Sequence, residues 1–311
     1  MRRIHVADPG FLTTMQDLGR FGYAHLGVSP CGAADSLSLR AGNRLVGNSD
    51  KAAVLEMTMT GGTFLFEEEA DFAVTGSDFG ASLDNRPVSC WTAVHADAGS
   101  QLRLGRSRGG ARCYLCVSGG FETVPILGSA STDLRSGFGG FNGRALRTGD
   151  RLAIGAATGR PRMSDARELR YCVSGATLRV TRGPQAGYFP AEALARLAGN
   201  LYVMRDDSNR LGIRLSGEPI HGSPQATFLT EGVSLGAVQI PPDGQPIILL
   251  VDQQTTGGYP KPFNVILADL PRAGQLAPRT AVRFVEVNLA TAHAALHDQE
   301  GRLAAVLGEA E

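Results

Sequence analysis

Residues 236–261 read GAVQIPPDGQPIILLVDQQTTGGYPK, and this stretch decides the kind of fold to expect. Two runs of β-type residues, at 236–241 and 246–252, flank the turn signal PPDG. This pattern predicts a β-hairpin. The second run ends in a polar loop whose adjacent glycines let the backbone come close to another segment or to a ligand.

The loop after this hairpin does not have the features of a nucleotide-binding loop. A Walker A loop needs GxxxxGK followed by Ser or Thr at the start of a helix. Lys261 instead lies between Pro260 and Pro262, so no helix begins in the required register. The chain also lacks a GxGxxG motif after a strand and an AMKM-type biotin attachment site, so we expect no covalently bound cofactor. An active-site loop and a well-packed turn remain as alternatives.

The rest of the chain indicates a mainly β protein with a few short helices. Glycine accounts for 40 of 311 residues, about 13% against about 7% in average proteins, which is typical of many turns and bulges. Short β-type runs separated by Gly, Pro, Asn or Asp predict antiparallel barrels or sandwiches. Helical character is confined to residues 34–48, with Asp35 as the N-cap, to residues 190–199, and to residues 290–311.

A polar segment at 155–168, GAATGRPRMSDARE, divides the chain nearly in half. We therefore predict an N-terminal β-rich subdomain over residues 1–160 and a C-terminal subdomain over 161–311. Because both halves combine β-type runs with a helix, two related barrel-like subdomains are the expected architecture.

Charge and composition exclude several classes of protein. The formal net charge is 0 and the basic residues are scattered, whereas nucleic-acid-binding proteins usually carry a basic face. The chain shows neither a signal peptide nor an apolar run of membrane-spanning length, so we expect a soluble, cytoplasmic protein with five reduced cysteines. Cys113 and Cys116 lie three residues apart in a predicted strand and face opposite sides, so no metal site is expected.

Two polar segments contain candidate catalytic groups. His25, in the glycine-rich segment 13–35, is a candidate proton acceptor because the pKa of histidine lies near neutrality. A hydrogen-bonded structural histidine is the alternative, and Asp17 and Arg20 in the same segment suggest a local ion pair. In RDDSNRLGIRLSG, residues 205–217, Arg210 is a candidate bidentate clamp for a substrate carboxylate or carbamoyl group. Asp207 is either a catalytic residue or the cap of the following turn.

Several segments, taken together, carry a family resemblance. They are residues 13–48, LEMTMTGGTFLF at 55–66, residues 128–152, DDSNRLGIRL at 206–215 and the opening stretch. In order and spacing they resemble the allophanate-hydrolase-subunit-2 family, also called the biotin-dependent carboxyltransferase or Kip-antagonist family, over about residues 4–286. The resemblance implies a cyclophilin-like β-barrel architecture, in agreement with the predicted strands.

The resemblance also implies an activity and partners. Stand-alone members act as the C-type component of an ATP-dependent 5-oxoprolinase, which hydrolyses the lactam of 5-oxoproline to glutamate. The implied partners are a subunit-1 protein (the B-type component of 5-oxoprolinase, Kip-inhibitor-like) and an A-type (LamB/YcsF-like) component. ATP is used by the complex, with the nucleotide site either on this chain or on a partner. The alternatives are a carboxyltransferase component acting on urea with biotin carried in trans, and a non-catalytic regulatory binding protein.

Within this resemblance, the expected site combines the two polar segments with the loop after the hairpin. The predicted catalytic residues are His25, Asp207 and Lys261, of which Lys261 is the best placed to neutralise developing negative charge. The predicted substrate-binding residues are Arg210, Gln254, Thr255, Thr256, Gly257 and Gly258. Gln253 stands where arginine is common in the family, which bears on the identity of an anionic substrate.

Overall fold

The computed structural model describes residues 2–162, 164–170, 176–222 and 228–308. It divides into two compact units, and the division does not follow the chain in a simple way. The first unit comprises Met1–Arg20, Cys31–Tyr171 and Glu300–Glu311, and the second comprises Phe21–Pro30 and Cys172–Gln299. The boundary at residue 160 stays a prediction, and Cys172 lies outside the described residues.

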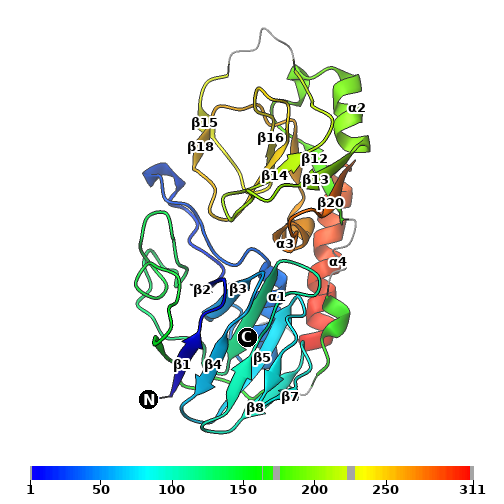
Figure 1. Cartoon of the computed structure of the whole chain (residues 1–311). Helices are drawn as coiled ribbons and strands as arrows, with labels where there is room; N and C mark the ends of the chain where they lie inside the picture. The colour runs from blue at the N-terminus through cyan, green and yellow to red at the C-terminus, as the bar shows by residue number, and fades with distance from the viewer. Residues whose placement is uncertain (1, 163, 171–175, 223–227, 309–311) are drawn as a thin grey trace. The chain divides into compact units, whose positions relative to one another are not determined.

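The first unit contains two antiparallel sheets (Figure 1). The six-stranded sheet has the order β11-β1-β4-β9-β6-β7 and the five-stranded sheet the order β2-β3-β10-β5-β8. The strands are β1 (Arg3–Asp8), β2 (Leu12–Gln16), β3 (Val54–Thr58), β4 (Thr63–Phe66), β5 (Ala70–Gly76), β6 (Ser82–Leu83), β7 (Arg86–Pro87), β8 (Ala93–Ala96), β9 (Gln101–Arg103), β10 (Arg112–Val117) and β11 (Arg151–Ala153). The unit also contains α1 (Ser36–Leu45) and the 3-10 helix η2 (Arg167–Leu169).

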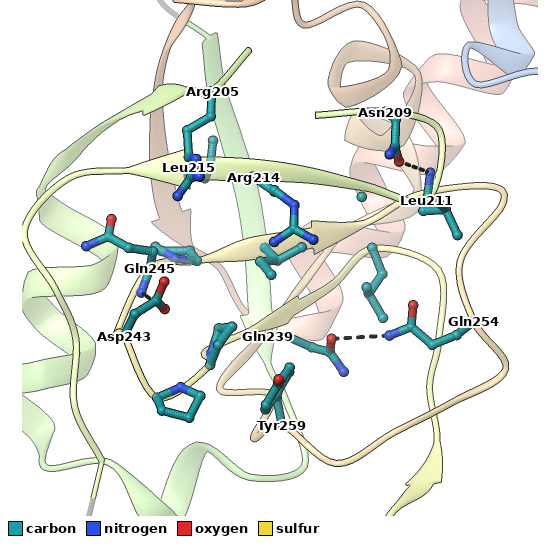
Figure 2. Close-up of a pocket in the computed structure, with 16 residues that line it drawn as sticks. Arg205, Asn209, Leu211, Arg214, Leu215, Gln239, Asp243, Gln245, Gln254 and Tyr259 are labelled. Carbon is teal, nitrogen blue, oxygen red and sulfur yellow. Dashed lines mark hydrogen bonds between the residues drawn. The ribbon is translucent and has the colours of Figure 1, made fainter. Parts of the chain in front are cut away.

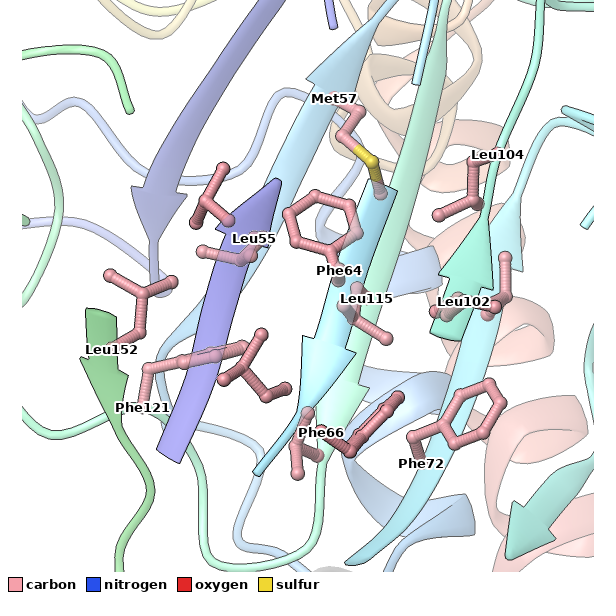
Figure 3. Close-up of a cluster of buried hydrophobic side chains, with 14 of the residues drawn as sticks. Leu55, Met57, Phe64, Phe66, Phe72, Leu102, Leu104, Leu115, Phe121 and Leu152 are labelled. Carbon is pink, nitrogen blue, oxygen red and sulfur yellow. The ribbon is translucent and has the colours of Figure 1, made fainter. Parts of the chain in front are cut away.

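The two sheets of the first unit share one apolar core (Figure 3). Phe64 and Phe66 of β4, from the six-stranded sheet, belong to the same buried cluster as Leu55 of β3 and Leu115 of β10, from the five-stranded sheet. Alternate residues of each strand enter the cluster, as expected for two sheets packed face to face.

A second apolar cluster lies between the five-stranded sheet and α1. Asp35 caps the N-terminus of α1 as predicted, because its side chain accepts a hydrogen bond from the Ser38 backbone N–H at 2.9 Å. Tyr114 and Cys116 of β10 belong to this cluster, whereas Cys113 belongs to the cluster between the sheets. The two cysteines of the CxxC motif therefore face opposite sides of the strand, as predicted. Among the described residues no group of three His, Cys, Asp or Glu side chains is arranged to bind a metal ion.

The last turns of α4 (Leu289–Leu307) are fixed to α1 by ion pairs within the first unit. Arg40 donates to Glu300 at 2.6 and 2.7 Å and to Asp50 at 2.9 Å, and Arg44 also pairs with Asp50. Burial raises the pKa of Asp50, but the hydrogen bonds from Arg44 and Arg40 outweigh this and hold that pKa below its usual value. The hydrogen bond from Arg40 likewise lowers the pKa of Glu300.

These lowered pKa values predict an acid-sensitive attachment of the end of α4. A carboxylate whose pKa is lower in the folded state stabilises that state above its unfolded pKa, about 4 for Asp and Glu, and the contribution disappears as the pH falls through the folded pKa. We therefore expect amide exchange at residues 303–307 to accelerate more than exchange in β10 when the pH is lowered from 6 to 3, after correction for the intrinsic rate. Replacing Glu300 by Gln should reduce this pH dependence, and an unchanged dependence would contradict the prediction.

The second unit contains a closed barrel of seven strands in the order β12-β19-β16-β17-β14-β13-β20, which confirms the mainly β, barrel-containing fold class. Its elements are η1 (Ala24–Leu26), β12 (Ala176–Arg182), η3 (Ala186–Tyr188), α2 (Ala191–Gly199), β13 (Leu201–Met204), β14 (Gly212–Ser216), β15 (Glu231–Gly232), β16 (Ala237–Gln239), β17 (Ile247–Leu249), β18 (Thr256–Gly257), β19 (Phe263–Val265), η4 (Leu267–Asp269), α3 (Leu270–Gly274), β20 (Ala281–Glu286) and the first part of α4. Strands β16 and β17 are the predicted hairpin, paired antiparallel through Val238–Ile248 and Gln239–Ile247.

Side chains of the barrel alternate between an apolar interior and an outer face. Ile213, Leu215, Val238 and Ile248 are at most 1% exposed and fill the interior. Their neighbours along β14, β16 and β17 therefore point outward. The polar loop predicted after the hairpin covers part of this outer face, and the candidate site lies there. None of the helices among the described residues is long and apolar enough to cross a membrane.

Candidate functional site

A row of three side chains crosses the outer face of the barrel. In the antiparallel register Ile247 of β17 lies opposite Arg214 of β14 on one side and opposite Gln239 of β16 on the other. Directly opposed residues place their side chains on the same face of a sheet, with neighbouring strands about 4.8 Å apart. The hairpin and β14 thus hold a cationic and an amide side chain on either side of an apolar one.

A cavity of about 500 Å³ lies over this row (Figure 2). Ile247 and Leu249 contribute apolar surface, and Gln254 and Tyr259 line it from the loop that follows the hairpin. Gly212 leaves the surface open beside Ile247, because a Cβ at this position would lie 3.0 Å from the Ile247 Cγ2 atom. The volume lies in the range of small-molecule sites, and polar and apolar side chains both line the cavity.

The Gln239 amide has a buried donor without a partner. This side chain is 2% exposed, and its Nε2 atom makes no hydrogen bond within the described part of the chain. The Gln254 Nε2 atom donates to Gln239 Oε1 at 3.5 Å, which orients the amide (Figure 2). An unsatisfied buried N–H costs about 1–3 kcal/mol. A ligand oxygen at this position would remove that cost.

Two arginines line the opposite side of the cavity and share one carboxylate. Asp207 accepts two hydrogen bonds from Arg205, both at 3.0 Å. The closest approach of Arg214 to Asp207 is 3.8 Å, which is too long for a hydrogen bond. Asp207 is half exposed and does not line the cavity itself. Its position suits orientation of the two guanidinium groups better than acid catalysis.

Arg210, the predicted carboxylate clamp, already binds a carboxylate of the protein. Its Nε and Nη2 atoms donate to the two oxygens of Asp252 at 2.8 and 2.9 Å, and both side chains are buried. Backbone bonds from Asp252 to Arg210 and from Leu250 to Leu211 join the same two segments. A substrate carboxylate would have to displace Asp252, so the arrangement favours a structural role that holds the cavity wall.

Lys261 is also buried and paired. Its Nζ atom lies 2.8 Å from the Glu231 carboxylate, and Gln185 donates to the same carboxylate at 2.6 Å. The hydrogen bonds from Lys261 and Gln185 lower the pKa of Glu231. Lys261 is 4% exposed and lines neither this cavity nor the second one described below. Stabilisation of substrate charge by Lys261 would require that Nζ leave Glu231.

The remaining predicted residues of the loop have different environments. Thr256 and Gly257 form β18, which pairs with β15, and the Thr255 carbonyl accepts the Val233 N–H at 3.1 Å. Gly258 lines a second, more apolar cavity of about 660 Å³ that shares Tyr259 with the first. Gln254 is the predicted loop residue whose side chain lines the first cavity. Part of this loop is thus packed as a turn and a short strand, and part of it lines a cavity, whereas its role as an active-site loop stays a prediction.

The residues predicted in the segment 13–35 lie elsewhere. His25 is exposed in η1 and lines neither cavity. The suggested ion pair between Asp17 and Arg20 is wrong. Asp17 accepts hydrogen bonds from Ser129, Ala130 and Ser131, whereas Arg20 donates to backbone carbonyl groups and stacks on Phe138 at 4.8 Å.

Sequence reasoning did not identify Arg205, Arg214, Gln239 or Tyr259 as site residues. Gln239 had one usable signal, since a polar residue in an otherwise apolar strand is uncommon. Arg214 alternates with the apolar residues Ile213 and Leu215 and resembles any outward-facing strand residue. Only the pairing of three strands shows that Arg214 and Gln239 belong to one site.

The structure is that of a mainly β protein with a polar cavity on the outer face of a closed barrel, and its relatives identify the family. The model of the carboxyltransferase domain, subdomains A and B, matches residues 26–286. The chain therefore belongs to this family, which confirms the resemblance seen in the sequence motifs.

Two bacterial proteins are similar along nearly their whole length. The C subunit of the 5-oxoprolinase of Escherichia coli is 38% identical over 297 residues, which cover 96% of this chain and 95% of that protein. The protein of the same name from Haemophilus influenzae is 36% identical, with 92% of each chain covered. The crystal structure of K. lactis urea amidolyase matches 98% of this chain with a TM-score of 0.92 at 29% identity, but the match covers only 20% of that larger chain.

Proposed function

We propose that this chain is the C-type component of an ATP-dependent 5-oxoprolinase complex and that the cavity over β14, β17 and β16 contacts the amide substrate. The observation that carries the proposal is the nearly full-length match to the C subunit of the Escherichia coli 5-oxoprolinase, which covers 95% of that protein. The cavity supports it, because a small amide fits a site with an oriented amide group, cationic side chains and apolar surface.

In the proposed reaction, the C–N bond of the lactam breaks and the oxygen of water is added to the carbonyl carbon, while ATP is hydrolysed to ADP and phosphate. The residues of this chain would hold the lactam and stabilise charge on its oxygen. The loop at 252–261 pairs as a strand at β18 and opens no helix, so it lacks the helix N-terminus of a Walker-type phosphate loop. We propose that the nucleotide binds to a partner protein.

The proposal includes two protein partners, a B-type component of the subunit-1 family and an A-type component. It also places the complex in the cytoplasm, where ATP is available and thiols such as Cys90 and Cys113 stay reduced.

The test is reconstitution. The chain is co-expressed with the B-type and A-type components, and release of glutamate from 5-oxoproline is measured with and without ATP. We expect ATP-dependent release by the full complex and none by the complex that lacks this chain. A verified complex of all three proteins that releases no glutamate would contradict the proposal.

A second candidate is favoured by the family and by the structural match to urea amidolyase. In this case the chain would be the carboxyltransferase component that moves CO₂ from carboxybiotin, carried on another protein, to urea. The same preparation, supplied with a biotin carboxylase, a biotin carrier, bicarbonate and ATP, would then form a carboxylated urea product and would not open 5-oxoproline.

Gly257 provides a variant that tests whether the cavity takes part in turnover. A Cβ at this position would lie 2.6 Å from Gln239 Nε2. Because a side-chain end gives way more easily than backbone, Gly257→Ala should displace the Gln239 amide at a cost of about 1–3 kcal/mol in stability. We expect kcat/KM of the complex to fall about tenfold or more, equivalent to about 1.4 kcal/mol.

The matched control is Gly232→Ala in the paired strand β15, where an added Cβ meets no atom within 4 Å. This variant should retain the activity of the wild-type complex. Equal activity of both variants would show that the geometry around Gln239 does not matter for turnover.

A further inference from the structure

We infer that the cavity selects a carboxylate-bearing lactam, with Gln239 as donor to the ring carbonyl oxygen and Arg214 as partner of the carboxylate. The inference deepens the proposed function and rests on it for the identity of the ring. It assigns recognition of the substrate to this chain and to two residues on strands of one barrel.

The cavity contains more free hydrogen-bond donors than free acceptors from the carboxylate that lines it. Gln239 Nε2 is buried without a partner, and the Arg214 guanidinium makes no hydrogen bond within the described part of the chain. The carboxylate that lines the cavity, Asp243, has one oxygen engaged with the backbone N–H of Gln245. A ligand rich in acceptors would satisfy both the buried Gln239 donor and the half-exposed Arg214 guanidinium. Urea presents two NH₂ groups and one oxygen and matches this surface poorly.

The two donors are spaced to bind opposite ends of a small ligand. Arg214 and Gln239 are two strands apart in one row, so their Cα atoms are separated by about 10 Å. Their side chains extend over the same face (Figure 2), and the strand register places Ile247 between them. A small ring with one acceptor at each end can lie on Ile247 and reach both donors. A ligand with a single acceptor group satisfies only one of them.

The two arginines of the cavity differ in their hydrogen bonds to Asp207. Arg205 is held by two hydrogen bonds to Asp207, whereas Arg214 approaches the same carboxylate no closer than 3.8 Å. Arg214 is therefore the one of the two that can form a bidentate pair with a ligand carboxylate without first breaking a hydrogen bond to Asp207. Asp207 acts as a positioning residue for Arg205, whose guanidinium group it holds through two hydrogen bonds.

Binding measurements on the full chain test the inference with four small molecules. They are 5-oxoproline, its carboxamide, 2-pyrrolidone, which lacks the carboxylate, and urea. By isothermal titration calorimetry we expect 5-oxoproline to bind at least tenfold more tightly than the carboxamide or 2-pyrrolidone, and urea to bind most weakly. The same order is expected for KM or inhibition in the reconstituted complex.

Two variants separate the two contacts. Arg214→Gln should weaken 5-oxoproline about tenfold, leave 2-pyrrolidone unchanged and so remove the preference for the carboxylate. Gln239→Met should weaken both lactams by the same factor, because it removes the donor to the carbonyl group that they share. Gln239→Glu, which keeps the shape but replaces the donor by an acceptor, provides a second variant if the first one folds poorly.

Arg283→Gln is the matched control, since Arg283 is an exposed arginine on the outer face of β20 in the same barrel. It should bind all four molecules as the wild type does. A preference for 5-oxoproline that persists in Arg214→Gln, or the absence of binding by both the chain and the complex, would overturn the inference.

The measurements distinguish a failure of this inference from a failure of the proposed function. Glutamate release that does not depend on Arg214 would leave the proposed function standing without this inference. Arg214-dependent binding in a complex that releases no glutamate would contradict the proposed function and leave the assignment of Arg214 standing.

Discussion

Replacement of Arg210 by Met is expected to lower the free energy of unfolding of the second unit by about 3–5 kcal/mol, because it leaves the buried Asp252 carboxylate without its partner. Arg210 is 6% exposed and Asp252 is 8% exposed, so water cannot easily replace the lost hydrogen bonds. The pair also joins the segment before β14 to the segment after β17, so the cavity wall should loosen as well.

Chemical denaturation followed by fluorescence or circular dichroism measures this loss. The double variant Arg210→Met with Asp252→Leu removes both charges and should recover part of the stability, since exchanging a buried ion pair for apolar residues is often nearly neutral. A loss below about 1 kcal/mol in the single variant would show that Asp252 is solvated or neutral without Arg210, which is contrary to the expectation.

The second large effect is expected at Asp17 in the first unit. Its carboxylate accepts hydrogen bonds from the Gly19 N–H at 2.7 Å, the Ala130 N–H at 2.6 Å and the hydroxyl groups of Ser129 and Ser131 at 2.6 and 2.5 Å. Asp17→Ala would leave several of these donors without an acceptor in a region where Asp17 is 7% exposed. At about 1–3 kcal/mol for each unsatisfied buried group, the loss should be about 3 kcal/mol or more.

The comparison for this prediction is Asp97→Ala, an aspartate of the first unit whose side chain is 89% exposed. Its effect should stay within about 0.5 kcal/mol. Thermal or chemical unfolding of both variants is sufficient, and equal stability of the two would show that the Asp17 network contributes nothing.

Local patterns predicted the elements of this fold well. The hairpin of β16 and β17 followed from PPDG between two apolar runs, and α1 followed from Asp35 ahead of a periodic segment. The opposite orientation of Cys113 and Cys116 followed from the period of two in a strand. Each of these depends on neighbours within a few residues, which is the range over which sequence patterns act.

Local patterns did not predict the hydrogen-bond partners of the buried charged residues. Asp17 and Arg20 are three residues apart, yet Asp17 accepts hydrogen bonds from residues 129–131, and Arg20 donates to carbonyl groups of residues 126 and 131. Arg210 is satisfied by Asp252, 42 residues away. Proximity in the sequence suggests a partner, but burial requires whichever acceptor the fold brings within hydrogen-bond distance.

By itself the sequence determined that the protein is mainly β, that a polar, glycine-containing loop follows a buried strand, and which family the motifs resemble. The tertiary structure decided which side chains share a site. Arg214 and Gln239 come from different strands. They line one cavity only because both strands pair with β17 in a register that places the two residues opposite Ile247. Strand register depends on contacts across the whole barrel, so no local pattern in the chain could specify it.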